Sequence, residues 1–303
     1  MTEFYEIIDP RFGDKIGSEA HLEELYSDCL WAEGPVWFAD HQCLYFSDIP
    51  NQRVMRYLPA DGSVTTFLNA SNFANGHTRD HEGRLISCEH GTRRVTRLEA
   101  DGDFAVLADS FAGKRLNSPN DVVVKSDGSI WFTDPTYGIL SNYEGYQAEP
   151  EQDAHGVYRI DAISGEITRV IDDFTQPNGI AFSPDETKLY VSESGFSHDP
   201  NVPRHIRVFD ILPDNTLASG REFCTIDVGL ADGFRFDRDG WLWSSSGDGV
   251  QVFDPMGKLA GRILLPQTAS NLTFGGPDKS RLYITATKSL YAVDVKAFGI
   301  QRP

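Results

Sequence analysis

A pair of short apolar segments that recurs six times constrains the fold of this 303-residue chain more than any other feature. Each first segment begins at a residue with a side-chain oxygen and runs into a turn rich in Asp, Gly or Pro. The second segment follows that turn, and four of the second segments end on an acidic residue. The first segments begin at Glu33, Asn75, Asn120, Asn178, Asp232 and Ser270. A repeat of this kind predicts one structural unit that is copied along the chain.

The repeated unit contains four short strands. A third apolar segment follows the second one, as at residues 54–57, and a weaker fourth segment closes the unit, as at residues 64–68. Six such units at a period of roughly 40 to 58 residues predict an all-β fold, a six-bladed β-propeller with four-stranded blades. The last unit has only three segments, so we expect an N-terminal strand at residues 21–26 to close the ring. The predicted organisation is an N-terminal extension, residues 1–20, followed by a single propeller domain, residues 21–303.

The net charge of −18 argues against nucleic acid as a partner, because phosphate binding requires basic patches. No apolar run approaches membrane-spanning length, and the N-terminus does not resemble a signal peptide. We therefore expect a cytoplasmic protein without a membrane partner, and the sequence does not indicate its oligomeric state. The four scattered cysteines predict reduced thiols, with a Cys29–Cys43 disulfide as the alternative.

The residues that begin the first segments are candidates for a metal site. In a β-propeller the first strand of each blade lines the central channel, so these residues converge at one mouth of it. All have side-chain oxygens, and Glu33 and Asp232 are carboxylates, with Asn271 as an alternative to Ser270 in the last repeat. Such a ring suits a hard cation with about six to eight oxygen ligands, first of all calcium, with magnesium, manganese or zinc as substitutes. The alternative for each residue alone is turn formation, because Asn-Gly and Asp-Gly are common turn dipeptides.

Other polar residues are expected at the same mouth. The second strands run antiparallel to the first, so their acidic ends return there, where they either face solvent or bind the cation ligands or substrate hydroxyls. These ends are Asp48, Glu89, Asp134 and Glu193. Arg115 and Asn117 enter the same mouth and are candidates for holding polar groups of a substrate, although pairing with a nearby acid is the alternative for Arg115. Two long connections, residues 135–156 and 194–204, are candidate lids.

Several motifs of this chain resemble the regucalcin (senescence marker protein)/gluconolactonase family, and they are especially similar to its bacterial gluconolactonase members. The similarity covers nearly all of the sequence beyond about residue 20. The motifs are Ala-Glu-Gly-Pro from Ala32, Asn-Gly-His-Thr from Asn75, Leu-Asn-Ser-Pro-Asn-Asp-Val from Leu116, Trp-Phe-Thr-Asp-Pro-Thr-Tyr-Gly from Trp131, Gln-Pro-Asn-Gly-Ile-Ala from Gln176, and Ala-Asp-Gly from Ala231.

This resemblance implies a single axial metal ion, and its ligands would map to Glu33, Asn120, Asn178 and Asp232. It also implies hydrolysis of a small sugar lactone. The Arg-x-Asn substrate element of the regucalcin branch matches only loosely, at Arg115 and Asn117. Relatives act on other lactones or on organophosphates, so a related hydrolase is one alternative function, and a non-catalytic calcium-binding propeller is another.

The expected mechanism is metal-assisted hydrolysis, with the cation as a Lewis acid at the lactone carbonyl. Asp232 is the expected catalytic residue, because it would both bind the cation and take a proton from the attacking water. Its alternative role is direct nucleophilic attack, which would give an acyl-enzyme. The expected substrate-binding residues are Arg115, Asn117, Asn75, Glu89 and Asp134, and their polarity favours a sugar lactone over a hydrophobic substrate.

Overall fold

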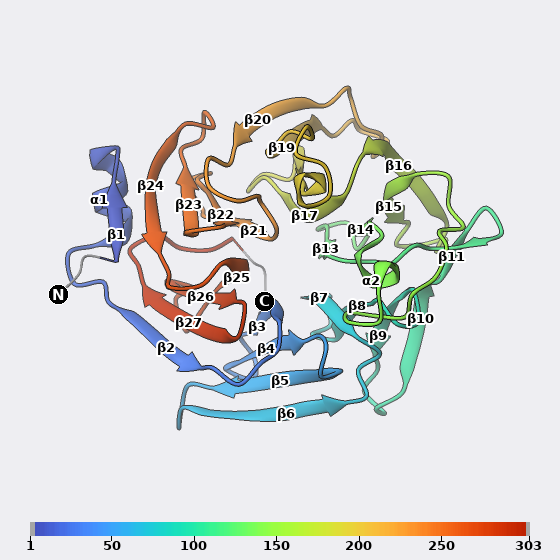
Figure 1. Ribbon diagram of the computed structural model, residues 1–303, viewed down its shortest axis with the longest axis horizontal. Coiled ribbons are helices and arrows are strands. Elements are labelled where there is room, and N and C mark those ends of the chain that lie inside the picture. The colour runs from blue at the N-terminus through green and yellow to red at the C-terminus, as the bar shows by residue number, and fades with distance from the viewer. Residues whose placement is uncertain (1–3, 301–303) are drawn as a thin grey trace.

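The six repeats form six antiparallel sheets around a central axis, which Figure 1 shows as the blades of a propeller. This computed structural model describes residues 4–300. In blades 1 to 5 the four strands of the repeat follow one another in chain order from the axis to the rim, whereas in blade 6 the outermost strand comes from the N-terminal side. The prediction of an all-β, six-bladed propeller with four-stranded blades is confirmed.

The strands of blades 1 to 3 are as follows. Blade 1 contains β3 (Ala32–Phe38), β4 (Cys43–Asp48), β5 (Arg53–Leu58) and β6 (Ser63–Asn69). Blade 2 contains β7 (Ala74–Arg79), β8 (Leu85–Glu89), β9 (Arg94–Leu98) and β10 (Phe104–Ala108). A small hairpin of β11 (Ser110–Phe111) and β12 (Lys114–Arg115) leads into blade 3, which contains β13 (Val122–Val124), β14 (Ile130–Asp134), β15 (His155–Ile160) and β16 (Ile167–Phe174).

The strands of blades 4 to 6 complete the ring. Blade 4 contains β17 (Pro177–Phe182), β18 (Lys188–Glu193), β19 (His205–Asp210) and β20 (Arg221–Thr225). Blade 5 contains β21 (Phe234–Phe236), β22 (Leu242–Ser246), β23 (Gly249–Phe253) and β24 (Leu259–Leu264). Blade 6 contains β25 (Ala269–Gly275), β26 (Arg281–Ala286), β27 (Ser289–Asp294) and, from the N-terminal side, β2 (Leu22–Tyr26).

An N-terminal strand closes the ring, as predicted. β2 pairs antiparallel with β27, with Leu22 opposite Val293, so blade 6 joins the two ends of the chain in one sheet. The preceding β1 (Tyr5–Ile7) adds a fifth strand to the rim of blade 5. Helix α1 (Pro10–Ile16) then buries Phe12 against the core of blades 5 and 6. The boundary that the sequence suggests at residue 20 stays a prediction.

Large aromatic side chains fill the spaces between neighbouring blades. Trp37 of blade 1 stacks on Tyr283 of blade 6, with ring centroids 5.6 Å apart. Trp131 of blade 3 packs its ring edge-on against Phe182 of blade 4, also at 5.6 Å. Burial of each such ring removes a large apolar area from water, and the aromatic pairs stabilise these interfaces further. The core is therefore distributed around the ring rather than gathered at its axis.

Hydrogen bonds between blades encircle the channel near one mouth. Each pair of neighbouring blades is joined by at least one such bond; in a set of six, one for each pair, five of the acceptors are backbone carbonyls of the residues that begin the repeats. The bonds run from Ser47 Oγ to Asn75 O (2.8 Å), Gly76 N to Asn120 O (2.8 Å), Thr133 Oγ1 to Asn178 O (2.7 Å), Gly179 N to Asp232 O (3.1 Å), Gly233 N to Ser270 O (2.8 Å), and Ser270 Oγ to Ala32 O (2.6 Å). We call this set the inter-blade hydrogen bonds.

The inter-blade hydrogen bonds explain the glycines that follow many of these residues. A Cβ atom on Gly76 would overlap the carbonyl oxygen of Asn120, and a Cβ atom on Gly179 would overlap that of Asp232. The Asn75-Gly76 and Asn178-Gly179 pairs lie inside β7 and β17, where an irregularity of the strand pairing gives each of them an extra residue. The alternative interpretation of these pairs as turns is therefore wrong. Glycine is needed here for the close approach of the next blade.

All four cysteines are buried and free, as expected for reduced thiols. Among the helices of residues 4–300, none has the length and apolar character needed to cross a membrane.

Replacing Gly179 by alanine tests the close approach of blades 4 and 5. The added methyl group meets backbone rather than a flexible side chain, so we expect the free energy of unfolding to fall by about 1–3 kcal/mol. Chemical denaturation measures the change. The control is Gly13→Ala in α1, where the new methyl group meets only the tip of Ile7 at 3.3 Å and alanine favours the helix. Equal stabilities of Gly179→Ala and the unsubstituted protein would contradict the packing argument.

Candidate active site

The residues that begin the repeats converge on the channel axis, as the sequence analysis expects. Glu33, Asn75 and Asn178 lie in the innermost strands β3, β7 and β17, while Asn120 and Asp232 directly precede β13 and β21. The side chains are in contact across blades. The Asn178 amide hydrogen-bonds Asp232, and Asn271 Nδ2 of blade 6 donates to Glu33 Oε2 at 3.0 Å. We call the set of residues that begin the repeats the axial ring; it consists of Glu33, Asn75, Asn120, Asn178, Asp232 and Ser270.

The two carboxylates of the axial ring are in an environment that opposes their charge. Burial, together with the charge of Asp121, raises the pKa of Glu33 to about 8. Burial and the charges of Glu33 and Asp121 raise the pKa of Asp232 well above its usual range. Glu33 is only 3% exposed, whereas Asp232 is half-buried, so Asp232 is the ring carboxylate that solvent reaches more easily.

Asp121 and Arg235 complete the charges at the axis, and the sequence analysis missed both. Asp121 is 1% exposed and follows Asn120, at the position that glycine occupies in blades 1, 2, 4 and 5. Arg235 Nη1 lies 3.5 Å from Asp121 Oδ2. A carboxylate at an otherwise glycine position was the signal that could have revealed Asp121, whereas its pairing with blade 5 is a long-range contact that no local pattern encodes.

The residues of the axial ring fit a divalent cation. With every group ionised, the three carboxylates and one guanidinium at the axis carry a net charge of −2, which one divalent ion would neutralise. Several buried oxygens there have no hydrogen-bond partner, which is costly unless a ligand binds them. These atoms are Glu33 Oε1, Asn75 Oδ1 and Asp121 Oδ2. The donor set consists of carboxylate and amide oxygens, which hard cations prefer.

A metal centre built only of carboxylate, imidazole and thiolate ligands is not found within residues 4–300. The proposed ligand set differs from such a centre, because two of its four members, Asn120 and Asn178, are amides. A cation at the axis therefore remains a prediction, and Glu33, Asn120, Asn178 and Asp232 are the residues that could hold it.

The acidic residues at the ends of the second strands hold the segments that lead into the axial ring. They are buried and do not face solvent. Asp48 accepts a hydrogen bond from Leu30 N (2.9 Å), Asp134 from Asn117 N (2.8 Å), and Glu193 from Thr175 N (2.7 Å). In each case the donor lies three residues before the ring residue of the same blade. These contacts assign the acids a positioning role.

Glu89 and Asp134, two of the expected substrate-binding residues, are among the acids that hold these segments. Glu89 accepts from Arg94 Nε (2.8 Å) and from the hydroxyl of Thr96 (2.9 Å), and it also contacts Asn72. Burial raises the pKa of Asp134 to about 7, and its Oδ1 has no hydrogen-bond partner. Contact of either residue with a substrate stays a prediction.

The remaining expected substrate-binding residues differ in their placement. Asn75 donates from Nδ2 to His90 Nε2 (3.2 Å), which leaves its Oδ1 free at the axis. Asn117 is buried and donates to the carbonyl oxygens of Asp134 and Ala154. Arg115 is exposed on β12, and its guanidinium donates to Thr92 O (3.1 Å), so the structure does not bring it together with the axial ring.

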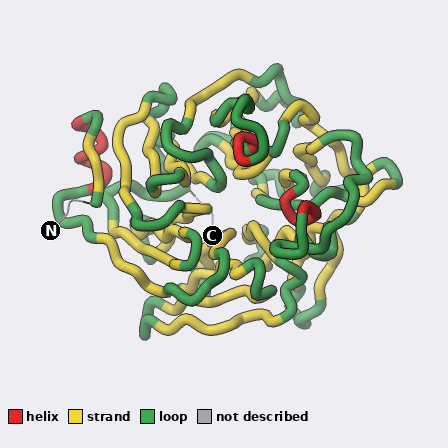
Figure 2. The backbone as a smooth tube through the Cα atoms, viewed as in Figure 1, coloured by secondary structure: helices red, strands yellow, loops and turns green. Residues whose placement is uncertain are grey.

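The two long connections lie next to each other beside the axial ring. The first contains helix α2 (Tyr137–Leu140) and the second contains the short helix η1 (Gly195–Ser197). Tyr137 Oη contacts Ser194 Oγ at 2.8 Å, and Ser194 Oγ accepts from Asn178 Nδ2 at 3.2 Å. Figure 2 shows both helices close to the centre of the propeller. The two connections thus lie where the sequence predicts lids, and their action as lids stays a prediction.

The first connection also carries a carboxylate, Glu144, that the sequence analysis missed. Burial raises the pKa of Glu144 to about 7, and its charge adds to those that raise the pKa of Asp232. His90 Nδ1 donates to the backbone oxygen of Glu144 at 3.0 Å and fastens this loop to blade 2. The mouth of the channel thus has polar groups both in the axial ring and in the first long connection.

The fold and the axial ring define the class of protein, a six-bladed propeller whose polar site lies at one mouth of its channel. Residues 31–288 match the family described as SMP-30/gluconolactonase/LRE-like region. A gluconolactonase of Zymomonas mobilis is 33% identical over 96% of this chain and 85% of its own length. The solved structure of a gluconolactonase from Xanthomonas campestris is 42% identical, has a TM-score of 0.90, and is matched over 97% of this chain and 95% of that one. A pentonolactonase of Haloferax volcanii is 29% identical over 86% and 82% of the two chains.

This chain belongs to the SMP-30/gluconolactonase/LRE-like family. The expected resemblance to gluconolactonases is confirmed, and the prediction of a lactonase is confirmed at the level of the family.

A buried histidine beside the axial ring gives a prediction for acid stability. His77 is 1% exposed, contacts the hydroxyls of Ser47 and Ser87 at 2.8 Å each, and has its pKa lowered from 6.5 to about 3 by burial. The unfolded chain therefore binds a proton below about pH 6.5 that the folded protein does not bind. The free energy of unfolding should fall with decreasing pH by about 1.4 kcal/mol per pH unit on account of this residue.

The His77→Gln variant isolates this contribution. Between about pH 6 and about pH 4.5, its stability should depend on pH less steeply than that of the unsubstituted protein. Urea denaturation at several pH values measures the slope. The control is His21→Gln, which removes an exposed histidine. Identical slopes for His77→Gln and the unsubstituted protein would show that His77 is not kept neutral by the fold.

Proposed function

We propose that this protein hydrolyses a small sugar lactone at the axial ring, with one divalent cation held by Glu33, Asn120, Asn178 and Asp232. The observation that carries the proposal is a buried cluster of acidic and amide side chains in which the oxygens Glu33 Oε1 and Asn75 Oδ1 have no hydrogen-bond partner. Calcium is the first choice, because all the donors are hard oxygens, and magnesium, manganese or zinc are the substitutes to test. Membership of the SMP-30/gluconolactonase/LRE-like family supports lactone hydrolysis.

Sugar lactones are the substrates that the polar mouth favours. The relatives named above are gluconolactonases and a pentonolactonase, which are named for lactones of sugar acids. The wall formed by the long connections offers the Tyr137 hydroxyl and the Glu144 carboxyl, and Asn75 Oδ1 is free at the axis. Such groups hydrogen-bond sugar hydroxyls, whereas a hydrophobic lactone or phosphotriester would leave Asn75 Oδ1 without a partner.

The chemistry divides between the cation and the side chains of this chain. A bound divalent cation would polarise the lactone carbonyl and stabilise the negative charge that develops on its oxygen. Asp232 would accept the proton of the attacking water, and its being the ring carboxylate that is not fully buried supports this role. That proton would then go to the ring oxygen of the lactone as the C–O bond breaks.

The alternative is attack by Asp232 itself on the carbonyl carbon. Hydrolysis in ¹⁸O-labelled water under single-turnover conditions separates the two, since only direct attack places label in the Asp232 carboxylate.

Removing the charged ligands tests the cation site. We expect Glu33→Gln and Asp232→Asn each to lose affinity for the cation and to lower kcat/KM by about 100-fold or more. The assay uses a panel of sugar lactones, glucono-1,5-lactone included, on chelated protein to which calcium, magnesium, manganese and zinc are returned one at a time. The control is Asp173→Asn, which removes an exposed carboxylate on β16 that pairs with Arg207. Full activity of chelated protein would contradict the metal dependence, and inactivity on every lactone with every metal would contradict the function.

Adding charge to the ring tests why two ligands are amides. Asn120→Asp or Asn178→Asp would place a third carboxylate on the cation and reduce its electrophilicity. We expect both variants to retain the cation and to lower kcat by about tenfold or more. Calorimetric titration measures binding, and the lactone assay measures kcat. Full activity of both variants would remove the argument that the amides keep the cation electrophilic.

A further inference from the structure

We propose that Arg235 is a built-in counter-charge of the axial ring, which sets the net charge at the axis so that one divalent cation neutralises it. This inference rests on the proposed cation site and adds a positioning residue to it. Arg235 reaches the axis from β21, three residues after Asp232. It would act through Asp121 and would not itself touch the cation or the lactone.

The position of Arg235 in the repeat singles it out. In blades 1 to 5 the third residue after the ring residue lines a cavity at the end of the channel away from the axial ring. In the other five blades this position carries no charge. Its occupants there are Val36, Thr78, Val123, Ala181 and Thr273. Arg235 is therefore the one charged residue that this layer of the channel contains within residues 4–300.

The contacts of Arg235 place its charge beneath the axial ring. Its Nη1 lies 3.5 Å from Asp121 Oδ2 and donates to Phe234 O at 2.7 Å. Asp121 Oδ1 accepts from Val122 N at 2.9 Å, whereas Oδ2 has no hydrogen bond of its own. The pair is long for a salt bridge but almost wholly buried, with Asp121 1% and Arg235 6% exposed. In such surroundings a charge acts strongly on its neighbours. The positive charge of Arg235 therefore favours the ionised form of Glu33.

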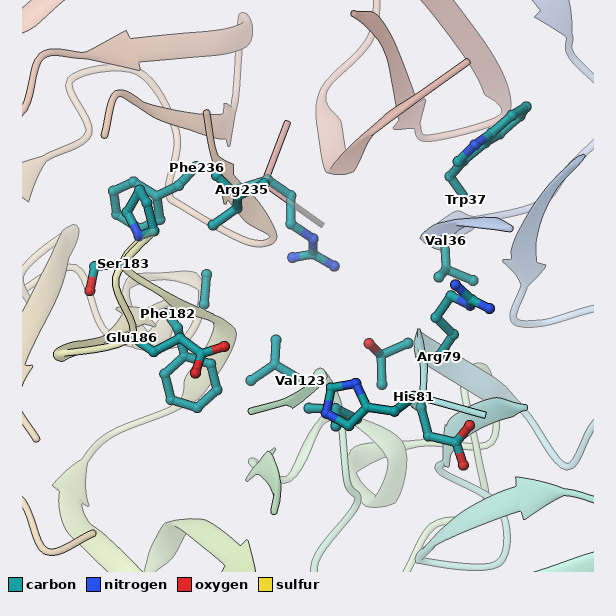
Figure 3. Close-up of a pocket in the computed structure, with 16 residues that line it drawn as sticks. Val36, Trp37, Arg79, His81, Val123, Phe182, Ser183, Glu186, Arg235 and Phe236 are labelled. Atoms are coloured by element: carbon teal, nitrogen blue, oxygen red, sulfur yellow. The ribbon is translucent and has the colours of Figure 1, made fainter. Parts of the chain in front are cut away.

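The channel beyond Arg235 opens to solvent at the mouth opposite the axial ring. Figure 3 shows the Arg235 guanidinium projecting into a cavity between Val123, Phe236 and His81. This cavity has a volume of about 130 Å³, which is enough for roughly four water molecules. The Asp121–Arg235 pair thus lies between this cavity and the axial ring. A cation that enters from the opposite mouth meets the guanidinium before it meets Asp121.

The net charge at the axis therefore depends on both members of the pair. With every carboxyl ionised, as a bound cation would favour, Glu33, Asp121 and Asp232 contribute three negative charges, and Arg235 contributes one positive charge. Replacing Arg235 by methionine changes the sum from −2 to −3, and replacing Asp121 by asparagine changes it to −1. The double variant restores −2. If Arg235 acts through its charge, cation affinity should follow this sum rather than the identity of the side chains.

Isothermal titration of metal-free protein with calcium at low ionic strength tests the inference. We expect Arg235→Met to bind calcium at least about tenfold more tightly or to bind a second ion, Asp121→Asn to bind it at least about tenfold more weakly, and the double variant to return to within about threefold of the unsubstituted protein. Arg235→Lys keeps the charge and should bind like the unsubstituted protein. Arg207→Met, which removes an arginine paired with Asp173 at the rim, is the control for overall charge.

The outcomes separate this inference from the proposed function. If the unsubstituted protein binds no divalent cation, the cation site itself is wrong. If it binds one and all variants at Arg235 and Asp121 bind more weakly, the pair has a packing role and the inference is overturned. Should Arg235→Met fail to fold because it leaves Asp121 unpaired, the double variant and Arg235→Lys still decide, since both keep the net charge at −2 and must retain the affinity.

Discussion

Six hydrogen bonds between neighbouring blades hold the backbone of the axial ring, and the geometry of the site depends on them. Each bond fixes a carbonyl next to a ring side chain, so no ring residue can move without its neighbour in the adjoining blade. Because the acceptors lie against glycine in blades 2 and 4, the blades approach more closely than side chains would allow. The acids at the ends of the second strands, such as Asp134 and Glu193, then fix the segments that enter the ring. A site held in this way is organised before any ligand arrives, which is what precise coordination and catalysis require.

This organisation has a cost in stability. Burial raises the pKa of Glu33, and that of Asp232 is raised further by its charged neighbours, so ionising both carboxylates at neutral pH opposes folding. The opposing contributions come from elsewhere in the ring. They include the aromatic contacts between blades, such as Trp37 on Tyr283, and the closure of blade 6 by β2. The cost at the axis also gives a reason for a ligand to bind there, since a cation would stabilise the charged forms that the fold alone disfavours.

The fold could be predicted from the sequence because its information is local and repeated. Six copies of one strand pattern indicate a propeller, and the position of Glu33 or Asn178 within the pattern indicates where it lies in a blade. The roles of residues whose partners lie far away in the chain could not be read in the same way. The pairing of Asp121 with Arg235 joins blades 3 and 5 across the channel, and the turn of Arg115 towards Thr92 depends on how β12 leaves blade 2. Local spacing contains neither contact, so the sequence suggested the axial ring but not the charges beneath it.

The departures from the repeat also show how a symmetrical scaffold can support an asymmetric site. Both ring carboxylates come from blades 1 and 5, which flank blade 6, whereas the amides come from blades 2, 3 and 4. The two long connections belong to blades 3 and 4, on the amide side, where Ser194 contacts Asn178. Asp121 and Asn271 occupy glycine positions in blades 3 and 6 and fill the channel beneath the ring. The two ring carboxylates therefore lie on one side of the axis, and the hydrogen-bonding loops lie on the other. A lactone bound between them would have its hydroxyls towards the loops and its carbonyl towards the ring carboxylates, where Asp232 is accessible.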